Sequence, residues 1–166
     1  MKSKTHKIRA GAASLLLLGS LILPLPAGAS SLEAHYTTAS LSAQEQSAGN
    51  LLNSDRARYA LAPLSIDPGL SRIARIKSED MRDNQYFSHT SPAYGDVRSM
   101  LRHFGVEFSA AGENIARHAT IEKAQAAFLS SPGHRRNIMS SFYTRVGLGV
   151  ALDPKGFVYL TQIFAR

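Results

Sequence analysis

The chain has 166 residues, no cysteine and a formal net charge of +7. The lack of cysteine excludes disulfides, thiolate metal sites and a cysteine nucleophile. No basic run is interleaved with aromatic residues, so the composition does not indicate a nucleic-acid-binding protein.

Residues 1–29 have the pattern of an export signal. A basic stretch precedes the apolar segment 12–23, and Pro24 and Pro26 interrupt the apolar run before the roughly 20 residues that a membrane-spanning helix requires. We therefore predict a signal peptide cleaved after Ala29, rather than an uncleaved anchor helix. Removing its four basic residues lowers the formal charge from +7 to +3, and the remaining segment 30–166 is long enough for one domain.

Residues 30–42 are rich in Ser, Ala and Thr and lack apolar periodicity, which predicts a flexible spacer before a domain over residues 43–166. Apolar residues at helical spacing predict a first helix over residues 44–59. Asp67 and Pro68 then supply an N-cap and a first-turn proline for a second helix that ends near residue 84.

The next segment, residues 85–94, has no helical period and predicts a loop that places His89 near the end of the second helix. A short third helix is expected from residue 97 to residue 104, with Gly105 as its left-handed terminator. Residues 106–118 are expected to be mostly extended.

The last third of the chain predicts a helix followed by a hairpin. Thr120 can cap a fourth helix that runs to residue 129, after which Ser131-Pro132-Gly133 predicts a turn. Residues 145–152 and 156–164 alternate in polarity and should pair as antiparallel strands. Helices followed by antiparallel strands indicate an α+β domain.

Three polar residues lie outside any regular apolar face: His89, Glu113 and His134. Two imidazoles can bind a divalent metal while a carboxylate orients or deprotonates a bound water. Without a metal, the three groups can titrate as a coupled acid–base set near neutral pH. They are far apart in the sequence and no local motif fixes their geometry. Spacing alone therefore favours a structural interpretation: a loop histidine, a carboxylate that caps backbone N–H groups, and a histidine at a helix start.

A series of short motifs runs in one order along nearly the whole predicted domain, and together they resemble a bacterial CAP domain. CAP denotes the superfamily of cysteine-rich secretory proteins, antigen 5 and pathogenesis-related proteins. The motifs are LLNSDRAR at 51–58, APL at 62–64, SEDM at 78–81, YFSH at 86–89, SP at 91–92, GENIA at 112–116, SPGHR at 131–135, NI at 137–138, VGLGV at 146–150 and YLTQIF at 159–164.

The resemblance implies an α+β fold, a single α-β-α sandwich with a small antiparallel sheet between helical layers and a central cleft. His89 and His134 match the two cleft histidines of the family, and Glu113 matches the glutamate of its Gly-Glu-Asn segment. By this resemblance, His89 and His134 are the candidate ligands of a divalent metal and Glu113 is a further candidate. Zinc is the first expectation, with calcium and magnesium as alternatives. The same three residues are the candidate catalytic residues if the protein is an enzyme.

The chain departs from the fuller family pattern in two places. Phe128, Leu129, Ser130 and Ser131 stand where many eukaryotic members have Trp, Tyr, Ser and a second cleft glutamate. The four-residue set of histidines and acids is thus reduced to three, which implies an open metal site whose shell water would complete. The disulfides of the family are absent as well.

Other motif residues have structural interpretations. Asn53 and Arg56 are expected to hydrogen-bond buried backbone or a carboxylate, and Asn114 and Asn137 to bind nearby backbone groups, as Asn does in turns and caps. Arg135 is expected in a structural ion pair, with an anionic ligand as the alternative.

Three functions remain open at this point, because a fold does not select among them. The first is a secreted or envelope-associated module that binds a metal ion and an extracellular or cell-envelope ligand, a lipid among the candidates. The second is a metal-dependent hydrolase of extracellular peptide or wall polymer, with Glu113 as general base. The third is a structural wall-associated module. We expect no nucleic-acid partner and no membrane anchor after cleavage, and the oligomeric state is open.

Overall fold

A computed structural model describes residues 40–166. The predicted signal peptide and most of the predicted spacer lie outside the described residues. Within the described part of the chain, no helix is long and apolar enough to cross a membrane.

The centre of the fold is a four-stranded sheet with the strand order β1-β3-β4-β2. The long strands β2 (Ala111–His118) and β3 (Arg145–Leu152) each pair with β4 (Val158–Ala165) in antiparallel fashion. The predicted hairpin of β3 and β4 is therefore confirmed. The short strand β1 (Ser65–Ile66) pairs with β3 in parallel, so the sheet is mixed rather than wholly antiparallel. Strand β2 forms one edge.

One face of the sheet is covered by α3 (Pro68–Asp83) and α4 (Val97–His103). Helix α3 packs very close to β3, because a Cβ atom added at Gly149 would lie 2.0 Å from the carbonyl carbon of Ala74. A Cβ at Gly147 would likewise meet the backbone of Leu70. The VGLGV motif thus serves helix packing.

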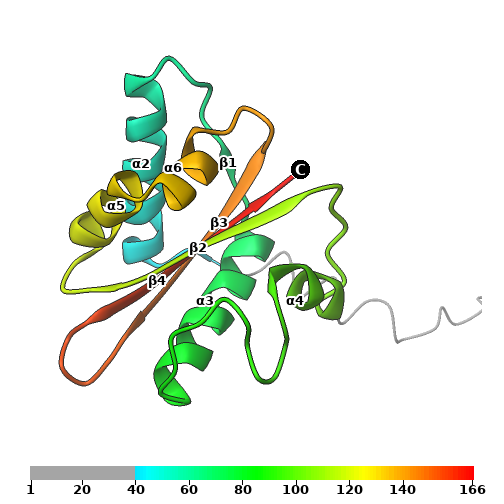
Figure 1. Ribbon diagram of the computed structural model, residues 1–166, viewed down its shortest axis with the longest axis vertical. Coiled ribbons are helices and arrows are strands. Elements are labelled where there is room, and N and C mark those ends of the chain that lie inside the picture. The colour runs from blue at the N-terminus through cyan, green and yellow to red at the C-terminus, as the bar shows by residue number, and fades with distance from the viewer. Residues whose placement is uncertain (1–39) are drawn as a thin grey trace, which may run out of the picture.

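The other face is covered by α2 (Ala43–Arg58), α5 (Ile121–Ser130) and α6 (Pro132–Met139). Figure 1 shows these three helices on one side of the sheet and α3 and α4 on the other. The predicted α+β architecture, a sandwich of two helical layers around a small sheet, is confirmed.

The segment Ser131-Pro132-Gly133 turns the chain, as predicted, and Pro132 is also the first residue of helix α6. His134 therefore lies at the start of a helix, as the structural interpretation of this residue expected. Proline is well suited to this position because the first helical N–H has no partner within the helix. The chain therefore bends at Ser131, which both ends α5 and precedes α6.

Side-chain caps explain why the other helices begin where they do. Asp67 accepts a hydrogen bond from the backbone N–H of Leu70, and Thr120 accepts one from that of Lys123, as predicted. Helix α2 begins with a capping box in which Ser42 and Glu45 bond each other's backbone N–H.

Two polar residues of α2 hydrogen-bond the backbone of neighbouring loops and of α6. The Arg56 guanidinium, which is buried, donates to the carbonyl oxygens of Ala62, Ile138 and Ser140 at 2.9, 2.6 and 2.8 Å. The Asn53 amide exchanges two hydrogen bonds with the backbone of Leu64. The structural role predicted for both residues is confirmed.

Candidate functional site

The Gly-Glu-Asn segment lies on the edge strand β2, where consecutive side chains point to opposite faces of the sheet. Glu113 pairs with Ile163, which packs in the core beneath α3 and α4. Asn114 pairs with Gln162, on the face covered by α5 and α6. The strand alternation thus sends the carboxylate to one helical layer and the amide to the other.

Glu113 holds the ring of His89. The distance from His89 Nδ1 to Glu113 Oε1 is 2.7 Å. A carboxylate only accepts, so Nδ1–H is the donor, and in the neutral ring the lone pair is then on Nε2. The Glu113 side chain is almost fully buried, whereas that of His89 is 56% exposed. A buried carboxylate therefore orients a histidine that reaches solvent.

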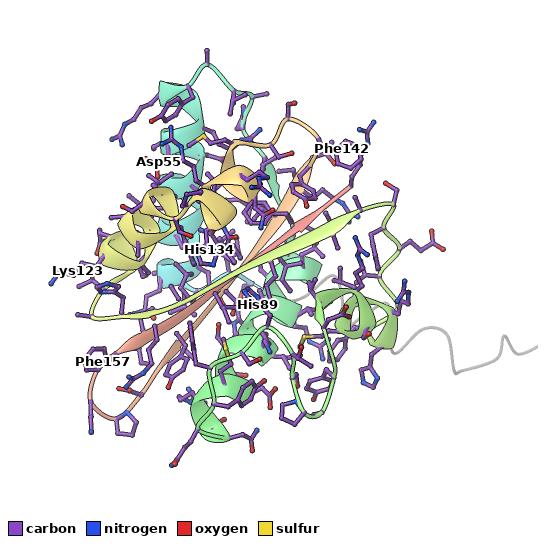
Figure 2. The ribbon with its side chains drawn as sticks, in the orientation of Figure 1. Asp55, His89, Lys123, His134, Phe142 and Phe157 are labelled. Atoms are coloured by element: carbon purple, nitrogen blue, oxygen red, sulfur yellow. The ribbon has the colours of Figure 1, made fainter. Side chains whose placement is uncertain are left out.

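His134 approaches from the opposite layer, on α6. The centres of the His89 and His134 rings are 6.3 Å apart, and the centre of the Phe128 ring lies 5.2 Å from that of His134 in an edge contact. Figure 2 shows the two histidines on either side of β2. The structure brings the three predicted residues together at this edge strand.

The two histidines have opposite electrostatic surroundings. The hydrogen bond with Glu113 raises the pKa of His89 above its usual value, although partial burial acts in the other direction. Burial lowers the pKa of His134, and the positive charge of His89 lowers it further. As the pH falls, His89 is protonated before His134.

One oxygen of the site lacks a partner. Among residues 40–166, Glu113 Oε2 is the one buried side-chain nitrogen or oxygen without a hydrogen bond. Buried polar atoms are nearly always paired, and an exception often marks a functional site or a place for water or an ion. Glu113 therefore has one acceptor oxygen that no group among residues 40–166 uses.

A polar cluster that sequence reasoning missed lies beneath this site. Lys77, almost fully buried on α3, donates to the Tyr86 hydroxyl at 3.2 Å. Asp80 accepts from Tyr86 and, at 2.6 Å, from Ser91. Burial lowers the pKa of Lys77, while the charges of Glu113 and Asp80 counteract this effect. The one sequence signal was a lysine on the apolar face of α3.

The same cluster fixes the loop that carries His89. Burial and the hydrogen bond to Asp80 raise the pKa of Tyr86 to about 12, so this hydroxyl remains a donor. Ser91 also exchanges two backbone hydrogen bonds with Gly95. The loop is therefore anchored on both sides of His89.

A second polar chain, also missed, runs behind Asn114. The Asn114 amide donates to the His134 carbonyl oxygen at 3.1 Å and to Gln162 at 3.0 Å. Gln162 donates to Gln125, which donates to Asp55. The prediction that Asn114 binds nearby backbone is wrong, because its partners are distant in the sequence.

Three further expectations need correction. Asn137 donates to Asn114 Oδ1 at 2.9 Å and to the Glu113 carbonyl oxygen at 3.3 Å, so its partners are also distant in sequence. Arg135 forms no ion pair among residues 40–166, and its guanidinium carbon lies 5.1 Å from the centre of the Tyr59 ring. Nor does Glu113 cap backbone N–H groups, as the structural interpretation required.

The donor set determines what kind of metal the site would fit. No group of three His, Cys, Asp or Glu side chains in the described part of the chain is placed to bind one metal ion. The candidate ligands are therefore the two imidazoles of His89 and His134. Zinc binds imidazole nitrogen at about 2.1 Å. The centres of two imidazole rings that bind the same zinc ion therefore lie roughly 5 to 6 Å apart. The centres of the His89 and His134 rings are 6.3 Å apart, which is close to this distance. Metal-binding histidines also commonly donate their other ring N–H to a carboxylate, as His89 donates Nδ1–H to Glu113.

The sandwich and its edge site define a CAP-type domain, and comparisons with known proteins agree. The family model described as "Cysteine-rich secretory protein family" matches residues 50–164. The chain belongs to this family.

Bacterial proteins are among its relatives. The chain is 42% identical over 128 residues to the uncharacterized protein YkwD of Bacillus subtilis, and 40% identical over 118 residues to the uncharacterized membrane protein YlbC of the same organism. These matches cover 76% and 70% of this chain, but 49% and 33% of the relatives. The chain therefore spans half or less of the curated relatives that it matches.

A solved structure shows the same fold. It is an extracellular protein containing an SCP domain from Bacillus anthracis, 37% identical, with a TM-score of 0.69. The match covers 74% of this chain and 40% of that protein. The shared part is thus one domain of a larger protein.

Proposed function

We propose that this protein is an extracellular or cell-envelope binding module whose paired histidines, His89 and His134, bind a divalent metal ion, zinc in the first place. The observation that carries the proposal is the hydrogen bond from His89 Nδ1 to the buried Glu113, with the second ring centred 6.3 Å from that of His89. The similarity to an extracellular SCP-domain protein and the leader-like segment 1–29 support an extracellular location.

The three residues have different roles in this proposal. His89 and His134 supply the metal-binding nitrogens, and Glu113 fixes the tautomer and direction of the His89 ring. When bound, the metal would act as a Lewis acid toward an oxygen of an extracellular or cell-envelope ligand. Because the His89 side chain is exposed, a ligand that arrives from solvent would contact His89 first.

Hydrolysis of peptide or wall polymer is a second candidate, favoured by the opposite pKa shifts of the two histidines. Paired groups with pKa values moved apart can act as acid and base. Glu113 is bonded to His89 in the present arrangement, so it supports the acid–base pair rather than acting as the base itself.

Calorimetric titration of the purified protein with zinc, calcium and magnesium tests the metal site. We expect one zinc ion per molecule, and at least a tenfold loss of affinity in His89→Ala and in His134→Ala. His103→Ala is the matched control, because His103 is exposed on α4 and packs against Tyr94 and Phe104, away from β2. Equal zinc affinity in all four proteins would refute the metal site. A panel of peptide and wall-polymer substrates, assayed with the same proteins, tests hydrolysis.

A further inference from the structure

An open groove with a volume of about 680 Å³ lies at the end of the sheet where β2 and β3 begin and β4 ends. This volume falls within the roughly 300–1,000 Å³ that is usual for ligand sites. We call it the arginine groove. It is lined by Arg102, Val106, Glu107, Phe108, Ser109, Arg145 and Arg166. None of the residues of the His89 site is among them, so the two sites are separate.

Three arginines reach the groove from different parts of the chain. Arg102 is on α4, Arg145 is the first residue of β3, and Arg166 follows the last residue of β4. The sheet register brings the latter two together, because Arg145 is directly opposite Ala165. Ser109 donates twice to the main-chain oxygen of Arg166 and fixes its backbone beside the groove.

The charges of the three arginines are not equally compensated. Arg145 forms an ion pair with Asp67 at 2.9 Å and donates to the carbonyl oxygen of Glu107 at 3.2 Å. Arg102 and Arg166 are in none of the ion pairs between residues 40 and 166. Both are exposed. Two exposed arginines that form no ion pair among residues 40–166 therefore line a groove whose one acidic lining residue is Glu107.

Aromatic rings pack against the guanidinium groups of these two arginines. The guanidinium carbon of Arg102 is 5.7 Å from the centre of the Phe108 ring, and that of Arg166 is 4.7 Å from the centre of the Phe142 ring. Such packing restrains a long side chain and leaves its N–H groups available. Guanidinium groups bind phosphate through paired hydrogen bonds.

We propose that the arginine groove binds a ligand with at least two phosphate groups, one at Arg102 and one at Arg166. Two separate cations favour a multiply charged ligand over a single phosphate ion. The groove is open, which suits a phosphate-bearing chain or headgroup that passes along the surface. This site does not depend on the proposed metal site.

The test uses the purified protein without added metal, with tripolyphosphate as the probe. We expect saturable binding that is weaker for inorganic phosphate, and at least a tenfold loss of tripolyphosphate affinity in the double variant Arg102→Gln/Arg166→Gln. The double variant Lys123→Gln/Lys155→Gln removes the same charge at exposed sites elsewhere and should change the affinity less than threefold.

A parallel arm uses cardiolipin vesicles, because the cardiolipin headgroup carries two phosphate groups, to distinguish two sources of the phosphate. Vesicle binding that tripolyphosphate displaces would identify a lipid headgroup, whereas tripolyphosphate binding without vesicle binding would identify a soluble or polymeric phosphate. The proposal is overturned if neither probe binds, or if both double variants have the same affinity. The double variant His89→Ala/His134→Ala should leave tripolyphosphate binding unchanged. The test of the arginine groove is therefore independent of whether the two histidines bind a metal.

Discussion

Glu113 and Asn114 are neighbours on β2, yet their surroundings differ completely. The Asn114 amide has partners on both its nitrogen and its oxygen, inside a buried polar chain that ends at Asp55. Glu113 has one side-chain partner, the exposed His89, and one orphaned oxygen. A fully paired buried network rigidifies a fold, whereas an unpaired buried group at an exposed edge is a candidate for function. The comparison separates the structural face of β2 from its functional face.

Replacing Asn114 should have the largest effect on stability. Asn114→Ala removes three hydrogen bonds and leaves Gln162 and the His134 carbonyl oxygen without these partners. Each unpaired buried group costs about 1–3 kcal/mol, so we expect a loss of about 3 kcal/mol in the free energy of unfolding. For a domain of this size, that lowers the Tm by roughly 10 °C.

Chemical denaturation measures this loss, with Asn50→Ala as the matched control. Asn50 is exposed on α2 and should change the free energy of unfolding by less than about 0.5 kcal/mol. If Asn114→Ala were as stable as the control, the structural role of this face would be wrong.

Glu113→Gln should have a smaller effect on stability and a larger one on binding. The change keeps the shape of a side chain whose Oε2 already lacks a partner, so we expect the free energy of unfolding to change by less than about 1 kcal/mol. Loss of a carboxylate that orients a metal-binding histidine typically lowers metal affinity about tenfold or more. Denaturation and zinc calorimetry on one sample measure both quantities. A large stability loss with unchanged zinc affinity would favour the structural interpretation of Glu113.

The smallest expected effect is a pH dependence of stability from His89. Its pKa is raised in the folded protein by Glu113, so the folded state binds the proton more tightly than the unfolded state. The resulting stabilisation is fully present below the unfolded pKa, near 6.5, and is lost as the pH rises through the higher folded pKa. Denaturation of wild type and His89→Gln from about pH 5 to about pH 9 should show a difference that shrinks as the pH rises. If the difference in the free energy of unfolding between wild type and His89→Gln grew with pH, the pKa of His89 would not be raised in the folded protein.

Local signals in the sequence were sufficient for most of the fold. Asp67 and Thr120 marked helix starts, and alternation marked β3 and β4. Strand β1 was missed because two residues are too few to show a period. Helix α6 was expected only through the structural interpretation of His134, because Ser-Pro-Gly is typical of turns, although proline also suits the first turn of a helix.

The candidate site was predicted in part. The motif resemblance identified His89, Glu113 and His134, and the structure places them together. Their division of roles was not predictable, because the hydrogen bond from His89 to Glu113 depends on how the loop meets β2. Gln125 and Gln162 carry no local sequence signal, since buried glutamines are recognised only by their partners.

The most direct test of the account follows the imidazole NMR signals of His89 and His134 during a zinc titration. If the two rings bind one ion across the edge of β2, both sets of signals should shift together and reach saturation at one equivalent of zinc, with His103 unaffected. Independent titration of the two rings, or saturation of only one of them at that ratio, would contradict the central claim that they form one site.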